Sequence, residues 1–180
     1  MDIEYKEITI EQLEPNMLKD FNRYQKVQKD WEKKGEELIL ETNPHIEDWN
    51  EEDKTRKVMC VFKTILENGG ELFGAFHGGK LIGFSGFDGI FLGSKNQYLQ
   101  LSELHVSYEY RGRKIGRELF NLCVHAALKH QCKKFYIVAS SSEDSQEFYR
   151  RTGCIDTEEL IPHLFDEDPF DIHMEYMINR

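Results

Sequence analysis

Four of the seven residues from 111 to 117 are basic, in a chain whose 33 acidic and 23 basic residues give a formal net charge of -10. The four are Arg111, Arg113, Lys114 and Arg117. Gly112 and Gly116 lie among them, and a helical apolar pattern begins at Ile115. The first N–H groups of a helix lack intrahelical partners, and the helix dipole favours negative charge there. The stretch therefore predicts an anion site at the start of a helix.

Two further side chains could move protons. Glu103 and His105 precede the basic turn. A carboxylate or a neutral imidazole can accept a proton. Glu103 is equally compatible with a structural ion pair, and His105 with a histidine held in the core.

The elements around these residues form a β-α-β unit. Residues 97–106 alternate like a strand, with Leu99, Leu101, Glu103 and His105 on one face. Residues 115–129 repeat apolar side chains at helical spacing, and residues 135–139 form a short apolar run typical of a buried parallel strand. The serines before Glu143 offer N-caps for a second helix, which Gly153 ends.

The remaining pattern predicts one mixed sheet with helices on its faces, in a single domain over residues 1–180. Asn50 caps a helix that runs to residue 68, and Gly78-Gly79 marks a tight hairpin. The other expected elements are strands at 2–10, 154–160 and 173–178, a helix from Pro15 through Trp31, and loops at 41–49, 88–96 and 161–171.

Composition narrows the setting and the class. The acidic balance argues against a general nucleic-acid binder. The four cysteines form no Cys-x-x-Cys pair, which favours a reduced, cytoplasmic setting with Cys123 in the core. The first residues do not look like a signal peptide, and no apolar run suits a membrane span. Histidines and acids show no metal-ligand spacing, so no metal is expected.

Two motifs resemble the GNAT superfamily of acyl-CoA-dependent N-acyltransferases. Residues 111–116 resemble the family's Gln/Arg-x-x-Gly-x-Gly/Ala loop after a strand, although Lys114 stands in place of the first motif glycine. Residues 145–154 resemble the family's helix that ends in Phe-Tyr-x-x-x-Gly-Phe, with Cys154 in place of the last Phe. Ser142 stands where many members carry Asn. The order and separation of the motifs also agree, from Leu72 to Ile178.

The resemblance implies an α/β fold of the GNAT type and direct transfer of an acetyl group from acetyl-CoA to an amine. It implies that two parallel strands splay after Val106, that the pantetheine arm pairs with the open strand, and that the basic turn holds the pyrophosphate. The residues implied to bind the coenzyme are Leu104, His105, Val106, Arg111, Gly112, Arg113, Lys114, Ile115, Gly116, Arg117, Ser142, Ser145 and Phe148.

The resemblance also implies Tyr149 as the acid on the thiolate side. Glu103 is the first candidate for the base and His105 the second. The acids Asp166, Glu167, Asp168 and Asp171 would suit a cationic acceptor, or they are a solvated charge run. The acceptor is unidentified and the oligomeric state is open, although homodimers are common in the family. Two other functions stay open: a domain that senses acyl-CoA without transfer, and an interaction protein whose basic turn meets a partner's phosphate or acid.

Overall fold

A seven-stranded mixed sheet in the order β1-β4-β5-β6-β7-β9-β8 forms the centre of the computed structural model, which describes residues 2–35 and 37–178. Among the strand pairs of the described residues, β6–β7 alone is parallel. The strands are β1 Glu4–Glu7, β4 Glu71–His77, β5 Lys80–Leu92, β6 Tyr98–Val106, β7 Lys134–Ala139, β8 Ile155–Asp156 and β9 Ile172–Met177. The mixed sheet predicted from the element order is confirmed.

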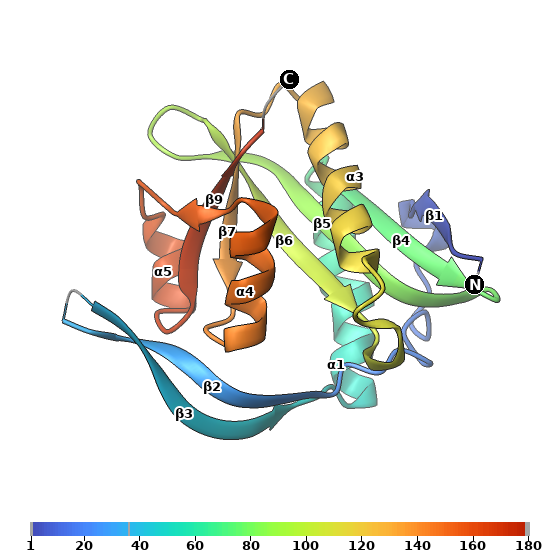
Figure 1. The fold of residues 1–180 in the computed structure, drawn as a ribbon. Helices are drawn as coiled ribbons and strands as arrows, with labels where there is room; N and C mark the ends of the chain where they lie inside the picture. Colours follow the sequence, from blue (N-terminus) through green and yellow to red (C-terminus); the bar gives the residue numbers. More distant parts are fainter. Residues whose placement is uncertain (1, 36, 179–180) are drawn as a thin grey trace.

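Helices cover both faces of this sheet (Figure 1). Helix α3 (Ile115–Lys129) covers one face through the largest buried cluster, which includes Leu99, Leu101, Leu119 and Cys123. The segment α1 (Glu51–Arg56), η2 (Lys57–Phe62) and α2 (Lys63–Glu67) covers the other. Short turns η1 (Ile10–Gln12) and η3 (Tyr108–Tyr110) and helices α4 (Glu143–Thr152) and α5 (Pro162–Glu167) complete the fold.

A β-bulge at Ser102 decides where the side chains at the end of β6 point. Gly86 pairs with Glu103, but its neighbour Phe87 pairs with Leu101, so Ser102 has no partner on β5. A single extra residue reverses the alternation of a strand. Leu99 and Leu101 therefore pack towards α3, whereas Glu103 and His105 point to the opposite face. The prediction that all four share one face is wrong at this bulge.

Strands β6 and β7 separate early. Their pairing runs only from Tyr98–Lys134 to Gln100–Tyr136, so the gap opens just before the bulge and not after Val106 as predicted. From there, β6 still pairs with β5 on its other side as far as Val106. The end of β6 thus has backbone groups towards β7 with no strand partner within the described residues.

The prediction of a helix from Pro15 to Trp31 is wrong throughout. Residues 15–20 form turns, and residues 25–34 form strand β2 (Gln25–Lys34), which pairs with β3 (Glu37–Glu47). Strand β3 replaces most of the predicted loop at 41–49. The backbone of Asp30 bridges to Ser142, and Trp31 N–H donates to Ser141 O at 2.8 Å. This long-range pairing outweighs local helical spacing. Pro44 is accommodated because it lies at a bulge between the Val27–His45 and Lys29–Thr42 pairs.

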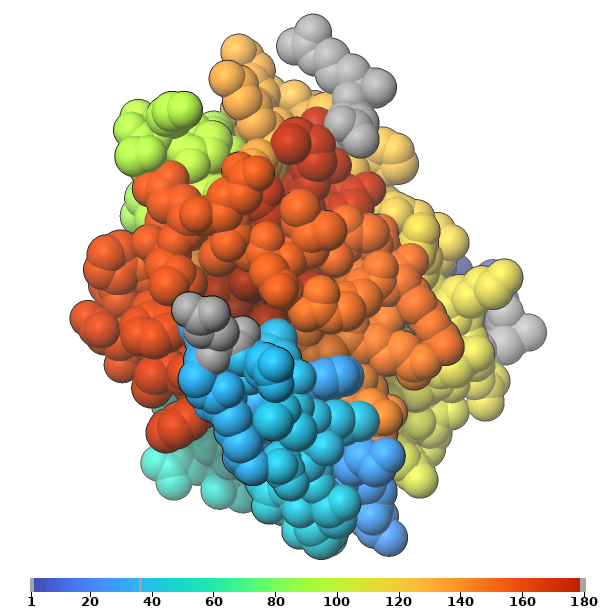
Figure 2. Space-filling view, turned by 60° about the vertical axis from the view of Figure 1, so that its left-hand side comes forward, coloured from blue at the N-terminus to red at the C-terminus, as the bar shows by residue number. Residues whose placement is uncertain are grey.

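The β2–β3 hairpin lies against the start of α4, at the carboxyl end of β7 (Figures 1 and 2).

The structure also differs from the sequence-based prediction at three other places. Strand β5 continues to Leu92 through an irregular stretch at 88–90, so the predicted loop at 88–96 is shorter. Helix α5 occupies most of the predicted loop at 161–171. The predicted strands at 2–10 and 154–160 are only the four residues of β1 and the two of β8.

The predicted Asn50 cap and Gly78-Gly79 turn are confirmed. Asn50 Oδ1 accepts from Asp53 N–H at 2.9 Å, and Gly78 and Gly79 both have positive φ in the turn from β4 to β5. The helix after Asn50 contains a π-helical segment from Lys57 to Phe62. Its residues Val58 and Phe62 are buried, which leaves Lys57 at the side of the segment near β6.

All four cysteines in the described residues are free thiols, and Cys123 is fully buried, as expected of a core residue. None of the helices within residues 2–35 and 37–178 is long and apolar enough to cross a membrane.

Candidate active site

The basic turn forms the N-terminus of α3. Lys114 is its N-cap residue and has φ 65° and ψ 5°, in the left-handed region that favours glycine. No side chain caps the first turn of α3. The backbone therefore takes the path that a glycine would give, and lysine accommodates it. The exposed start of a fifteen-residue helix is suited to an anion.

The arginines of the turn point to backbone carbonyl groups. Arg111 Nε donates to Val106 O at 2.9 Å, and its Nη2 donates to Arg23 O at 3.1 Å. Arg117 donates to Arg151 O at 3.2 Å, and Arg113 donates to Glu109 O at 3.3 Å. Burial lowers the pKa of Arg111, and nearby Arg23 lowers it further. Arg111 thus ties the end of β6 to the turn.

Helix α4 closes against this turn. A Cβ on Gly116 would lie 3.5 Å from the ring of Phe148 and 3.6 Å from Val106, so the end of β6, the start of α3 and α4 meet here. Ser142 is buried and bonds to Ser140 and Gln25, while Ser145 is half-buried on α4. The predicted residues therefore lie around the gap between β6 and β7, with Ser142 held by protein contacts.

Glu103 lies at the centre of a buried ion network. Its Oε1 accepts from Lys57 Nζ at 2.8 Å, and its Oε2 lies 3.2 Å from His105 Nε2. The Glu103 side chain is 5% exposed. The imidazole lies off the line that a hydrogen bond needs, so Oε2 has no hydrogen-bond partner among residues 2–35 and 37–178. The predicted pair on one face of β6 is thus close together, and Lys57 is joined to it.

Aromatic rings enclose the imidazole of His105. Trp49 meets it edge-on with 4.9 Å between centroids, and Phe84 is tilted against it at 5.3 Å. Lys57 Nζ and Arg23 Cζ lie over the Trp49 ring at 5.1 and 5.6 Å. The His105 side chain is 24% exposed, so one edge of the ring is still accessible.

These surroundings determine the charge states of Glu103 and His105. Burial lowers the pKa of His105, and the positive charges of Arg23 and Lys57 lower it further, whereas Glu103 raises it. Burial alone would raise the pKa of Glu103, but His105 and Lys57 outweigh it and hold that pKa below its usual value. At neutral pH the pair is a carboxylate compensated by Lys57 beside a neutral imidazole.

Tyr149 lies on α4 and packs half-buried against the α3-side core, with Phe148 edge-on at 5.2 Å. Burial raises the pKa of its phenol well above the usual value, and the charges of Cys154 and Glu103 contribute. Its hydroxyl makes no hydrogen bond within the described chain, so it can meet a ligand.

Of the acidic residues predicted in the loop at 161–171, Asp171 interacts electrostatically with the candidate site. Asp171 is half-buried, and burial raises its pKa to about 6, with further contributions from Asp168, Glu47 and Asp30. It also acts on the phenol of Tyr149. Asp166, Glu167 and Asp168 are exposed on or after α5. Within the described residues, no cluster of three or more His, Cys, Asp or Glu is arranged to hold a metal.

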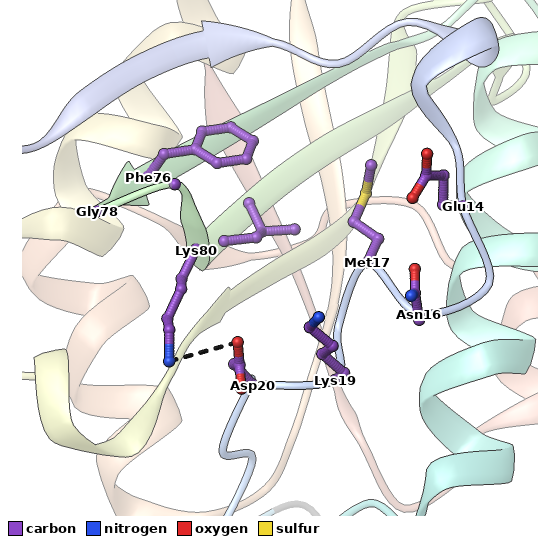
Figure 3. Close-up of a pocket in the computed structure, with 10 residues that line it drawn as sticks. Glu14, Asn16, Met17, Lys19, Asp20, Phe76, Gly78 and Lys80 are labelled. Atoms are coloured by element: carbon purple, nitrogen blue, oxygen red, sulfur yellow. Dashed lines mark ion pairs between the residues drawn. The ribbon is translucent and has the colours of Figure 1, made fainter.

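A cavity of about 390 Å³ lies elsewhere, between residues 14–20 and the β4–β5 turn (Figure 3). Lys80 and Asp20 form an ion pair at 3.4 Å on its edge. Its lining residues are Glu14, Asn16, Met17, Lys19, Asp20, Phe76, Gly78, Gly79, Lys80 and Leu81. None of these is among the residues predicted to do chemistry.

Sequence reasoning missed Lys57, Trp49 and Arg23. Lys57 and Trp49 flank the cap at Asn50, 46 and 54 residues before Glu103, and only the fold brings them together. No local signal marks Lys57, because its position depends on the π-helical turn.

The family model described as "Acetyltransferase (GNAT) family" matches residues 27–154 of the chain. This match covers more than half of the chain and includes both motifs. The chain belongs to this family. No curated protein sequence matches the chain significantly. The GNAT match covers the β2–β3 hairpin, the π-helical segment, the basic turn and α4.

Solved structures share the fold at low identity. A nourseothricin acetyltransferase has a TM-score of 0.74 at 16% identity, with 99% of this chain and 100% of that chain covered. A protein named as a streptothricin acetyltransferase from Bacillus anthracis, in complex with acetyl coenzyme A, has a TM-score of 0.71 at 13% identity over 99% and 100%. The PaiA N-acetyltransferase of Thermoplasma acidophilum, in complex with coenzyme A, has a TM-score of 0.61 at 18% identity over 98% and 99%.

Proposed function

We propose that this GNAT protein transfers an acetyl group from acetyl-CoA to the nitrogen of an amine. The observation that carries the proposal is the opening between β6 and β7, beside which Val106 at the end of β6, Gly116 at the start of α3 and Phe148 on α4 meet. Two of its structural neighbours contain acetyl coenzyme A or coenzyme A.

The coenzyme would lie along this opening. The first N–H groups of α3 and the positive charge of Lys114 suit a pyrophosphate. The free backbone edge of β6 suits the amides of the pantetheine arm, which would pair like an added strand. Arg111 would support the site indirectly, because it holds Val106 O and the turn together.

Two proton transfers follow from the chemistry. An alkylammonium acceptor must lose one proton before its nitrogen attacks the thioester carbonyl, and the departing thiolate must gain one. The N–C bond forms and the C–S bond breaks. The ammonium loses two protons: one goes to the base, and the other restores the proton that Tyr149 gives to the thiolate. We assign the first transfer to neutral His105, whose imidazolium Glu103 would stabilise, in preference to Glu103 itself, whose Oε1 is occupied by Lys57.

Tyr149 is assigned to the thiolate. Since burial raises the pKa of this phenol, the transfer requires that the site also raise the basicity of the departing thiolate. The acidic residues Asp171, Glu47 and Asp30 support a cationic acceptor. We also propose that the protein works in the cytoplasm and forms a homodimer.

The test is release of free thiol from acetyl-CoA with a panel of polyamines, aminoglycosides, amino acids and peptides. Mass spectrometry of the product should show one added acetyl group on nitrogen. Acetyl-CoA binding without transfer to any amine of the panel would favour a sensing domain instead. If saturating acetyl-CoA did not raise the melting temperature, coenzyme binding itself would be refuted, since a ligand of the native state must stabilise it.

A further inference from the structure

Lys57 approaches the candidate active site from outside both family motifs. It lies at the first position of the π-helical segment, its side chain is 19% exposed, and its ammonium donates to Glu103 Oε1 at 2.8 Å. Surface lysines usually stay solvated, because a buried ion pair loses much of its attraction to desolvation. A lysine at the start of a π-helical segment that meets a buried carboxylate beside the proposed reacting residues needs a functional reason.

The contacts of Lys57 restrict the Glu103 carboxylate to one orientation. Oε1 is occupied by the ammonium, so Oε2 is the oxygen that faces His105 Nε2, at 3.2 Å. Lys57 is itself held over the Trp49 ring, and the same ring borders His105. Three side chains from three separate segments thus fix one another around the imidazole.

This arrangement determines which imidazole nitrogen can act. Although the two groups are not aligned for a hydrogen bond, the negative charge 3.2 Å from Nε2 favours the proton on that nitrogen. Nδ1 is then left with the lone pair that accepts a proton. An imidazolium formed at Nδ1 would then be stabilised by Glu103, while Lys57 keeps the carboxylate ionised. The logic is that of a base oriented by a carboxylate, with the carboxylate in turn oriented by an ammonium.

We propose that Lys57 is a positioning residue, which fixes Glu103 against His105 so that neutral His105 takes the proton of the acceptor amine. The inference rests on the proposed N-acetyl transfer and adds a residue to it. The charged groups that act on His105 are Glu103 on β6, Lys57 on η2 and Arg23 before β2, and the charge of Glu103 also acts on Tyr149 of α4. Trp49 and Phe84, its ring neighbours, are uncharged.

The test compares Lys57→Met, which keeps the side-chain length without charge, with Lys57→Arg, which keeps the charge. In Lys57→Met the imidazole loses a repelling cation, so the acid limb of the kcat/KM profile should move up by about one pH unit. Below that limb, kcat/KM should fall about tenfold. Lys57→Arg should restore the limb of the unmodified protein.

The matched control is Lys63→Met. Lys63 is a helical lysine six residues later that pairs with Glu67 at 3.5 Å on the surface, and its loss should leave the profile unchanged. A Lys57→Met protein with lower activity but an unmoved acid limb would show a merely structural role and overturn the inference. So would a Lys57→Met protein whose profile matched that of the unmodified protein.

An NMR titration of the His105 imidazole, assigned by its loss in His105→Asn, gives a readout that needs no turnover. The midpoint should rise in Lys57→Met and in Lys57→Gln, either of which serves if the other does not fold, and should stay in Lys57→Arg. An unmoved midpoint overturns the positioning role even where transfer is intact. Failure of the unmodified protein to acetylate any amine overturns the proposed function separately, whatever the titration shows.

Discussion

The phenol of Tyr149 is the residue whose chemistry is easiest to isolate, because its hydroxyl makes no hydrogen bond within the described residues and its ring packs on the core. Tyr149→Phe keeps the ring and removes the proton. We expect kcat to fall about a hundredfold, with KM for acetyl-CoA changed less than about threefold, since a proton donor acts in the transition state. Steady-state kinetics measure both values.

The matched control for this substitution is Tyr176→Phe. Tyr176 packs edge-on against Phe120 at 5.0 Å, against the same core, and its loss of a hydroxyl should leave kcat unchanged. A Tyr149→Phe enzyme as fast as the unmodified protein would remove Tyr149 from the mechanism.

Lys114 combines a charge with an unfavourable backbone conformation. At φ 65° a β-branched residue is strained by about 1–2 kcal/mol, whereas glycine is not. Lys114→Val should therefore lower the melting temperature, while Lys114→Gly should keep or raise it. Because the proposed pyrophosphate loses one cation in both, the dissociation constant for acetyl-CoA should rise in both, and less so at high salt. Thermal unfolding and calorimetry at two salt concentrations measure these effects.

Equal melting temperatures of the Gly and Val variants would contradict the backbone argument at Lys114. Unchanged acetyl-CoA affinity in both variants would instead contradict the placement of the pyrophosphate.

At the scale of elements, the bulge at Ser102 coincides with the point where β6 leaves β7. Deletion of Ser102 removes the extra residue but keeps Glu103 and His105 on their present face. The β6–β7 pairing could then continue past Gln100 and close the gap. We expect a folded protein whose melting temperature no longer rises with acetyl-CoA.

Ser102→Ala is the matched control for that deletion, because it removes only a hydroxyl whose bond to Gln100 O is 3.3 Å long. It should keep the full response to acetyl-CoA. A deletion variant that still responded as strongly would show that the bulge does not create the coenzyme site.

The same bulge explains how far the sequence could predict the site. Local patterns sufficed for α3, β7 and α4, because the apolar pattern marks α3 and β7 and Gly153 marks the end of α4. The face of Glu103 and the hairpin at β2 could not be predicted, since a one-residue bulge and a pairing to Ser142 leave no local pattern. Lys57 was missed for the same reason: its contact depends on a π-helical turn and a partner 46 residues away.

At the scale of the whole molecule, distant parts of an acidic chain bring carboxylates together beside the site. Asp30 and Glu47 come from the hairpin, and Asp168 and Asp171 from the segment between α5 and β9. Some are compensated: Glu47 pairs with Arg23 at 2.7 Å, and Asp30 accepts from Asn43 at 3.1 Å. Asp171 is left in a half-buried position among like charges, and its pKa is raised from 3.8 to about 6.

That shift has a definite consequence for stability. The folded state holds the Asp171 proton up to about pH 6, whereas the unfolded chain releases it near pH 3.8. Stability therefore falls as pH rises through this window, and above pH 6 the charged carboxylate destabilises the fold, by about 1 kcal/mol after solvent screening. Asp171→Asn should raise the melting temperature at pH 7.5 by about 2–4 °C, and the difference should vanish at pH 4.

Asp166→Asn, on the exposed side of α5, is the control and should show no such pH dependence. A gain for Asp171→Asn that was equal at both pH values would contradict the charge argument, and a loss at pH 7.5 would mean that the carboxylate stabilises the fold.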